Sequence, residues 1–122
     1  MRLNLLVIKT AHLEQLQAQY SLLGLSFVYH QHGNGPFHYA CEQEDFVLEL
    51  YPLSQQQTQA DHTIRLGFEV AKLTPLLQQL QNSSWKIVRS IQTMPWGNTA
   101  VIQDLDGRKI ELTEVKRQHS TP

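Results

Sequence analysis

The sequence has one cysteine, no long apolar run and no excess of either charge. Cys41 has no second cysteine to pair with, so an intramolecular disulfide is excluded. No segment approaches the roughly 20 consecutive apolar residues of a membrane-spanning helix. The 10 basic and 11 acidic residues give a net charge of −1, which offers no basic footprint for nucleic acid. We therefore expect a cytoplasmic protein that binds neither nucleic acid nor membrane.

The second half of the chain repeats the pattern of the first half at a spacing of about 60 residues. Each half opens with an apolar extended run, residues 3–10 and 64–70, followed by leucines at helical spacing. This spacing predicts one amphipathic helix in each half. Gly24 is expected to end the first helix, and Thr74 before Pro75 is expected to begin the second.

Three more strands are predicted after each helix, because β-branched and aromatic residues alternate between turn residues. They cover residues 25–29, 37–41, 46–51, 85–88, 98–103 and 109–115. The order βαβββ, repeated twice, predicts an α+β fold in which two modules form an open, cup-shaped β-sheet. The alternative, a ferredoxin-like α/β barrel dimer, would require βαββαβ order instead.

The 122 residues are expected to form a single domain. Module one is predicted at residues 1–53 and module two at residues 62–116. The glutamine-rich segment 54–61 has no apolar periodicity and is interpreted as a solvated linker. The tail at 117–122 is expected to be frayed.

Two glutamates, Glu49 and Glu111, lie 62 positions apart in similar segments at the ends of the two halves. Period-two alternation puts Tyr51 on the same face of its strand as Glu49. The first of these strands is apolar on both sides, so Glu49 is expected to be partly buried. A buried carboxylate needs a proton, a cation or a metal beside it.

Two motifs in the second half resemble those of a known family. They are Pro-Trp-Gly at residues 95–97 and Asp-Leu-Asp-Gly-Arg-Lys-Ile-Glu-Leu at residues 104–112. Both are similar to signature motifs of the vicinal oxygen chelate superfamily of glyoxalases, bleomycin-resistance proteins and extradiol dioxygenases. The resemblance covers residues 3–116 and departs at Leu105, where the family usually has proline. It implies the glyoxalase/bleomycin resistance-like fold and a homodimer.

Metal-dependent members of that family use four ligand positions, on the first and last strands of each module. The resemblance assigns these positions to Leu5, Glu49, Arg65 and Glu111. Leu5 has no donor atom and Arg65 only donates hydrogen bonds, so two of the four ligands are missing. We therefore predict no metal cofactor. A divalent metal held differently, with His38 as the extra ligand, stays open as an alternative.

A small-molecule site is predicted from the same positions. Its expected lining residues are Glu49, Arg65, Glu111, Tyr51, His38 and Trp96. The Arg65 guanidinium would supply positive charge and forked donors where the metal would sit, and an internal ion pair is the alternative. Trp96 is expected at the rim of the cavity, at a dimer contact or in a turn. His30 and His32, near a predicted hairpin, are expected to be exposed.

Three functions remain open from the sequence. The first is a metal-independent small-molecule-binding protein of glyoxalase/bleomycin-resistance type. The second is a lyase, isomerase or dioxygenase of glyoxalase type, with Glu49 or Glu111 as the candidate catalytic base. The third is a dimeric interaction domain with a vestigial cavity.

Overall fold

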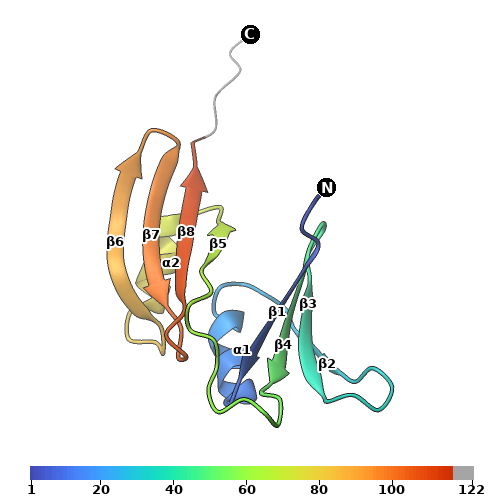
Figure 1. Ribbon diagram of the computed structural model, residues 1–122. Helices are drawn as coiled ribbons and strands as arrows, with labels where there is room; N and C mark the ends of the chain where they lie inside the picture. Colours follow the sequence, from blue (N-terminus) through green and yellow to red (C-terminus); the bar gives the residue numbers. More distant parts are fainter. Residues whose placement is uncertain (117–122) are drawn as a thin grey trace. The chain divides into compact units, whose positions relative to one another are not determined.

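The computed structural model describes residues 1–116, and the predicted tail at 117–122 lies outside them. The chain divides into two compact units, with the boundary between His62 and Thr63 (Figure 1). Within the described residues 1–116, each unit holds one helix and one four-stranded sheet.

The sheet of the first unit has the strand order β1-β4-β3-β2. Strand β1 runs parallel to β4, and the other neighbours are antiparallel. In chain order the elements are β1 (Leu5–Thr10), α1 (Leu13–Ser21), β2 (Val28–His30), β3 (His38–Glu42) and β4 (Val47–Pro52).

The sheet of the second unit repeats this topology with the order β5-β8-β7-β6. Its elements are β5 (Leu66–Glu69), α2 (Leu73–Leu80), β6 (Lys86–Met94), β7 (Gly97–Gln103) and β8 (Lys109–Val115). The predicted βαβββ order is therefore confirmed in both halves, and neither sheet closes into a barrel.

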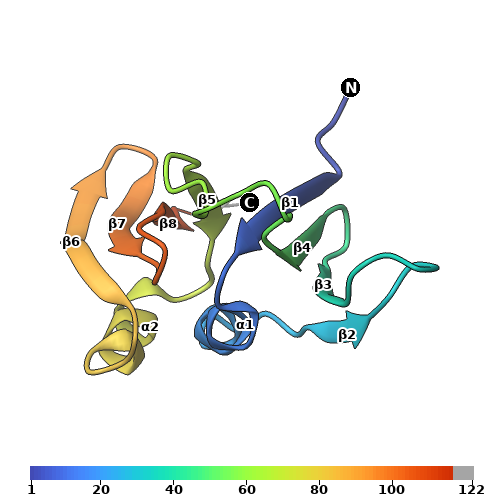
Figure 2. The same cartoon turned by 60° about the horizontal axis from the view of Figure 1, so that its bottom comes forward.

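Helix α1 packs against β1 and β4 and covers one face of the first sheet (Figure 2). Leu16 and Tyr20, one helical turn apart, are buried on the helix, and Leu48 and Leu50 are buried on β4. On the same face of the sheet, the Tyr39 hydroxyl donates a hydrogen bond to the Glu14 carboxylate of α1 at 2.7 Å. Side chains of opposite strand parity, including Glu49, lie on the other face.

Helix α2 buries Leu73, Leu77 and Leu80 and begins at a different residue from the one expected. Thr74 and Pro75 lie inside its first turn, so the predicted Thr74 cap is wrong. A tertiary contact replaces it, because the Leu73 amide donates to the Glu114 carboxylate of β8 at 2.7 Å. A local sequence pattern cannot reveal a partner 41 residues away.

Strand β6 is longer than predicted, since it continues from Lys86 to Met94. It is an edge strand, and most of its later side chains are exposed. Its polar composition therefore hides its pairing with β7, which is closed by a two-residue turn between Met94 and Gly97. Within residues 1–116, no helix is long and apolar enough to cross a membrane.

Candidate functional site

The pairing of three strands gathers polar side chains on the face of the first sheet that α1 leaves uncovered. His30 at the end of β2 pairs with His38 at the start of β3, and Ala40 of β3 pairs with Glu49 of β4. Residues two apart on a strand share a face, so His30, His38 and Glu49 lie on the same side. The hydrogen bond of Tyr39 to α1 identifies the opposite side as the covered one.

His38 is the centre of this group. The residue is 0% exposed, and the Nδ1 atom of its ring lies 3.2 Å from the Pro36 carbonyl oxygen. That oxygen only accepts, so Nδ1 donates the hydrogen bond. The Nε2 atom, on the other side of the ring, lies 3.3 Å from the Glu49 carboxylate. His38 is therefore held from both edges of its ring.

Tyr51 forms one wall of the group, because its ring stacks on His38 with centroids 4.1 Å apart. Its hydroxyl lies 3.4 Å from His38 Nε2. Burial raises the pKa of the Tyr51 phenol, and the nearby Glu49 carboxylate raises this pKa further. The structure thus brings together three of the six predicted site residues, His38, Glu49 and Tyr51.

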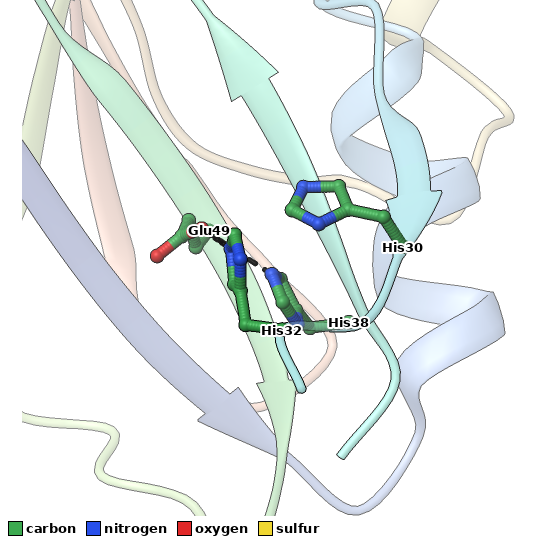
Figure 3. A group of neighbouring side chains, drawn as sticks. All are labelled: His30, His32, His38 and Glu49. Atoms are coloured by element: carbon green, nitrogen blue, oxygen red, sulfur yellow. Dashed lines mark ion pairs between the residues drawn. The ribbon is translucent and has the colours of Figure 1, made fainter. Parts of the chain in front are cut away.

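His30 and His32 complete a group of four potential metal ligands with His38 and Glu49 (Figure 3). One nitrogen of each imidazole and one carboxylate oxygen all lie within 4.8 Å of one another. The side chain of Glu49 is only 13% exposed, whereas that of His32, in the β2–β3 loop, is 69% exposed. We call these four residues the histidine cluster.

Arg65, Trp96 and Glu111, the other three predicted site residues, belong to the second unit. Arg65 is exposed and precedes β5, while Glu111 lies in β8 opposite Gly67. Within residues 1–116, neither Arg65 nor Glu111 takes part in an ion pair. A site that these residues share with Glu49 stays a prediction.

The β6–β7 hairpin places Trp96 at its tip, where the residue is 55% exposed. This position agrees with the expected turn.

The remaining candidates lie outside this group. Trp85 is buried, and Cys41 is a buried free cysteine in β3. A hollow beside the start of α2 is lined by Ala71, Lys72 and residues of β8, and none of the predicted site residues lines it.

Comparison with known proteins identifies the family. The sequence matches the profile of the Glyoxalase/Bleomycin resistance protein/Dioxygenase superfamily over residues 5–112. The chain belongs to this superfamily. No curated protein matches the sequence.

Solved structures with this superfamily fold come from several bacteria. The antibiotic-binding protein TnmS3 from Streptomyces sp. CB03234 is 19% identical, with a TM-score of 0.76 over 95% of this chain and 97% of its own. An integron cassette protein from the mobile metagenome of V. cholerae is 20% identical, with a TM-score of 0.72 over 95% of this chain and 96% of its own. A virulence protein from Salmonella typhimurium is 17% identical, with a TM-score of 0.68 over 95% and 98%. Identities this low show a shared fold and no more.

The observed strand pairing shows which side chains lie near Glu49, one of the four superfamily ligand positions. Leu5 pairs with Val47 in the parallel β1–β4 ladder and therefore lies on the same face as Glu49. Leu5 has no atom to coordinate a metal, and the imidazoles of His30, His32 and His38 stand near Glu49 instead. The donor atoms around Glu49 thus come from β2, β3 and their loop.

His30 and His32 are the functional candidates that sequence reasoning missed. The Asn34-Gly35 pair, which favours a turn, carried the information, because a hairpin centred on Asn34 pairs His30 with His38. This pairing places the imidazoles of His30 and His38 side by side, and the neighbouring strand adds the Glu49 carboxylate. The expected exposure is correct for His32, whereas His30 is only half-exposed.

Tyr39 provides a test of the packing between α1 and the sheet. Its hydrogen bond to the Glu14 carboxylate, together with burial, raises the pKa of Tyr39 to about 12. The folded state therefore favours the protonated phenol, and the resulting stability is complete below pH 10 and is lost between pH 10 and about 12. We expect tyrosinate absorbance after rapid pH jumps to show a late step that Tyr39→Phe removes and Glu14→Gln moves to lower pH.

The exposed Glu44 offers a matched control for this titration, since Glu44→Gln removes the same charge away from Tyr39. Glu44→Gln should leave the late step in place. Superimposable titrations of the parent protein and Glu14→Gln would show that the hydrogen bond does not form in solution.

Proposed function

We propose that this superfamily member binds a small organic molecule on the face of the first sheet that carries Glu49, His38 and Tyr51. One observation carries the proposal, namely the Glu49 carboxylate at 3.3 Å from a buried imidazole that is itself stacked on a tyrosine. Glu49 remains 13% exposed, so a molecule on this face has access to it. The antibiotic-binding protein TnmS3 from Streptomyces has the same fold, so this fold is compatible with binding a small molecule.

The chemistry of the face favours a particular class of molecule. A largely buried carboxylate such as that of Glu49 attracts hydrogen-bond donors and cationic groups more strongly than an exposed one, because less water competes. Tyr51 adds an aromatic surface beside Glu49. We therefore expect an aromatic compound with amino or hydroxyl groups, and binding that requires no metal ion at the four superfamily ligand positions. Arg65, Glu111 and Trp96 are proposed to contribute from the second unit.

The proposed binding is tested by removing the charge of Glu49. Bleomycin and a panel of aromatic amines and phenols are screened by the rise they cause in melting temperature. A compound that binds the parent protein should bind Glu49→Gln roughly tenfold to hundredfold more weakly, because a hydrogen bond to a charged group contributes about 1.5–3 kcal/mol. The dissociation constants are measured by titration calorimetry.

Glu44→Gln is the control, since Glu44 is exposed and lies in the bend between β3 and β4. It should bind each compound as the parent does. Equal binding by the parent protein and Glu49→Gln would leave Glu49 with a structural role only and would remove the proposed site.

A second candidate function is a metal-dependent lyase, isomerase or dioxygenase of glyoxalase type. The specific observation in its favour is the presence of three imidazoles next to Glu49. In this function Glu49 or Glu111 would take a proton next to a carbonyl group, and a metal would stabilise the negative charge that develops on oxygen. Turnover of glyoxalase or extradiol dioxygenase substrates, abolished by Glu49→Gln, distinguishes it from simple binding.

The assembly and the location of the protein complete the proposal. We propose a homodimer, in keeping with the superfamily resemblance, and a cytoplasmic location, in keeping with the single cysteine.

A further inference from the structure

The structure assigns a divalent transition-metal site to the histidine cluster of His30, His32, His38 and Glu49. The four donors belong to one unit and come from adjacent strands and the loop between them. Only Glu49 is shared with the four ligand positions of the superfamily. The assignment therefore departs from the expectation of no metal, which considered those four positions.

The spacing of the donor atoms is close to that of a metal site. Ligand atoms about 2.0–2.2 Å from a tetrahedral metal lie roughly 3.4 Å from one another. The Glu49 carboxylate oxygen lies 3.3 Å from His38 Nε2 and 3.9 Å from His32 Nε2. All four donor atoms lie within 4.8 Å of one another, so no pair has to approach by more than about 1.4 Å to reach the spacing of metal ligands. His32 has the freedom to make this shift, because its side chain is exposed in the loop before β3.

The hydrogen bonding of His38 prepares it to be a ligand. Its Nδ1 donates to the Pro36 carbonyl, which leaves the Nε2 lone pair directed at the Glu49 carboxylate. An imidazole fixed through one nitrogen to a backbone carbonyl is the usual arrangement of a metal-bound histidine. A lone pair that faces a carboxylate oxygen at 3.3 Å is unfavourable unless a proton or a metal cation stands between them.

The rest of the cluster favours the metal over the proton. A proton on His38 Nε2 would form an ion pair with Glu49 and account for these two residues alone. Such a proton would not explain why the imidazoles of His30 and His32 also contact that of His38. Their ring centroids lie 4.3 Å and 4.9 Å, respectively, from the His38 centroid. One carboxylate balances only one imidazolium, whereas a single divalent cation uses all three neutral nitrogens and the carboxylate.

The donor set also selects the class of metal. Three imidazole nitrogens and one carboxylate oxygen suit Zn²⁺, Co²⁺, Ni²⁺ or Fe²⁺, while Mg²⁺ and Ca²⁺ prefer sites made of oxygen ligands. Tyr51 lies at the edge of the site, with its hydroxyl 3.4 Å from His38 Nε2. A bound metal would replace this weak contact and leave the stacked phenol as a wall of the site.

The first test uses chelator-treated, untagged full-length protein titrated with ZnCl₂ by calorimetry. We expect one Zn²⁺ per chain and a higher melting temperature with Zn²⁺, Co²⁺ or Ni²⁺ than with Mg²⁺. His32→Gln and His30→Gln should each weaken Zn²⁺ binding roughly tenfold or more, since each removes a ligand. His62→Gln is the matched control, because His62 is exposed and lies outside the cluster.

Two results of this first test would overturn the assignment. One is the absence of both binding heat and a rise in melting temperature with any of the three transition metals. The other is an equal loss of affinity in His32→Gln and His62→Gln, which would indicate unspecific binding by exposed histidines. His32→Gln carries little risk to the fold, and its metal-free melting temperature should match that of the parent protein.

His38 is buried, so a substitution there could disturb the fold. Its role is therefore tested in the parent protein, from the ¹⁵N resonances of its imidazole. On addition of Zn²⁺ we expect the Nε2 resonance to move while Nδ1 stays protonated. An unchanged Nε2 resonance in the presence of saturating Zn²⁺ would show that His38 is not a ligand and would overturn the assignment. Neither test uses an organic ligand, so failure of the metal site would leave the proposed small-molecule binding intact.

Discussion

Arg108→Met is expected to lower the free energy of unfolding by about 3–5 kcal/mol, the largest effect we predict for a single substitution. The Arg108 and Asp104 side chains are both 0% exposed and form an ion pair at 3.1 Å. The same guanidinium nitrogen lies 3.0 Å from the Asp106 carboxylate. Methionine fills much of the space but leaves the Asp104 carboxylate buried without this cation, which is the costly part of breaking a buried pair. Urea denaturation followed by circular dichroism measures the change.

Lys109→Met provides the control for this substitution. It removes one positive charge by the same replacement at the neighbouring residue, which is exposed. We expect a change within about 0.5 kcal/mol. Asp104→Asn combined with Arg108→Met should recover part of the loss, because the amide oxygen can still accept from the turn amides while the buried charge is gone. If Arg108→Met is no more destabilising than Lys109→Met, the buried ion pair does not hold this turn together.

Gly97→Ala is expected to destabilise the protein by about 2–4 kcal/mol, the second-largest effect. Gly97 has φ +147°, a conformation that side-chain-bearing residues rarely adopt. A Cβ atom at this position would also collide with the Glu114 backbone carbonyl of β8. The same residue closes the two-residue turn between β6 and β7, so the backbone cannot relax without disturbing both neighbours. Thermal and urea unfolding measure the loss.

Gly67→Ala distinguishes this effect from the general cost of replacing a glycine. Gly67 lies in β5 of the same unit, and a Cβ there would meet the Glu111 carbonyl oxygen at an ordinary 3.9 Å. We expect little change or a slight gain in stability, since alanine reduces the freedom of the unfolded chain. Equal stability of the two alanine variants would contradict the close approach of Gly97 to β8.

The contacts of Arg108 and Gly97 give a structural role to the two superfamily motifs of the second unit. The Pro-Trp-Gly motif supplies the tip of the β6–β7 hairpin and the residue that allows β7 to approach β8 closely. The Asp-Leu-Asp-Gly-Arg motif closes the turn between β7 and β8, where the Asp104 carboxylate accepts from two backbone amides. Both motifs therefore stabilise the fold. The metal site that we propose consists of residues of the first unit alone.

Much of the fold could be predicted because it depends on local patterns. Leucines at helical spacing mark the buried sides of α1 and α2, and alternation marks Leu48 and Leu50 as the buried face of β4. The same alternation placed Glu49 and Tyr51 together on the other face. Prediction failed where the partner was distant in the chain, as for the start of α2, where Glu114 of β8 accepts from Leu73. It also failed for the polar edge strand β6, whose pairing determines its length.

The sequence by itself determined the two βαβββ units, the superfamily and the positions of Glu49 and Glu111 on the last strands. These features could be predicted because side-chain periodicity and turn residues act over a few neighbouring positions of the sequence. Only the tertiary structure decided that His30 and His32 join His38 at Glu49, because strand pairing and the loop between β2 and β3 bring their rings together. Contacts of that kind depend on strand register, and a shift by one residue would turn His38 and Glu49 to opposite faces of the sheet.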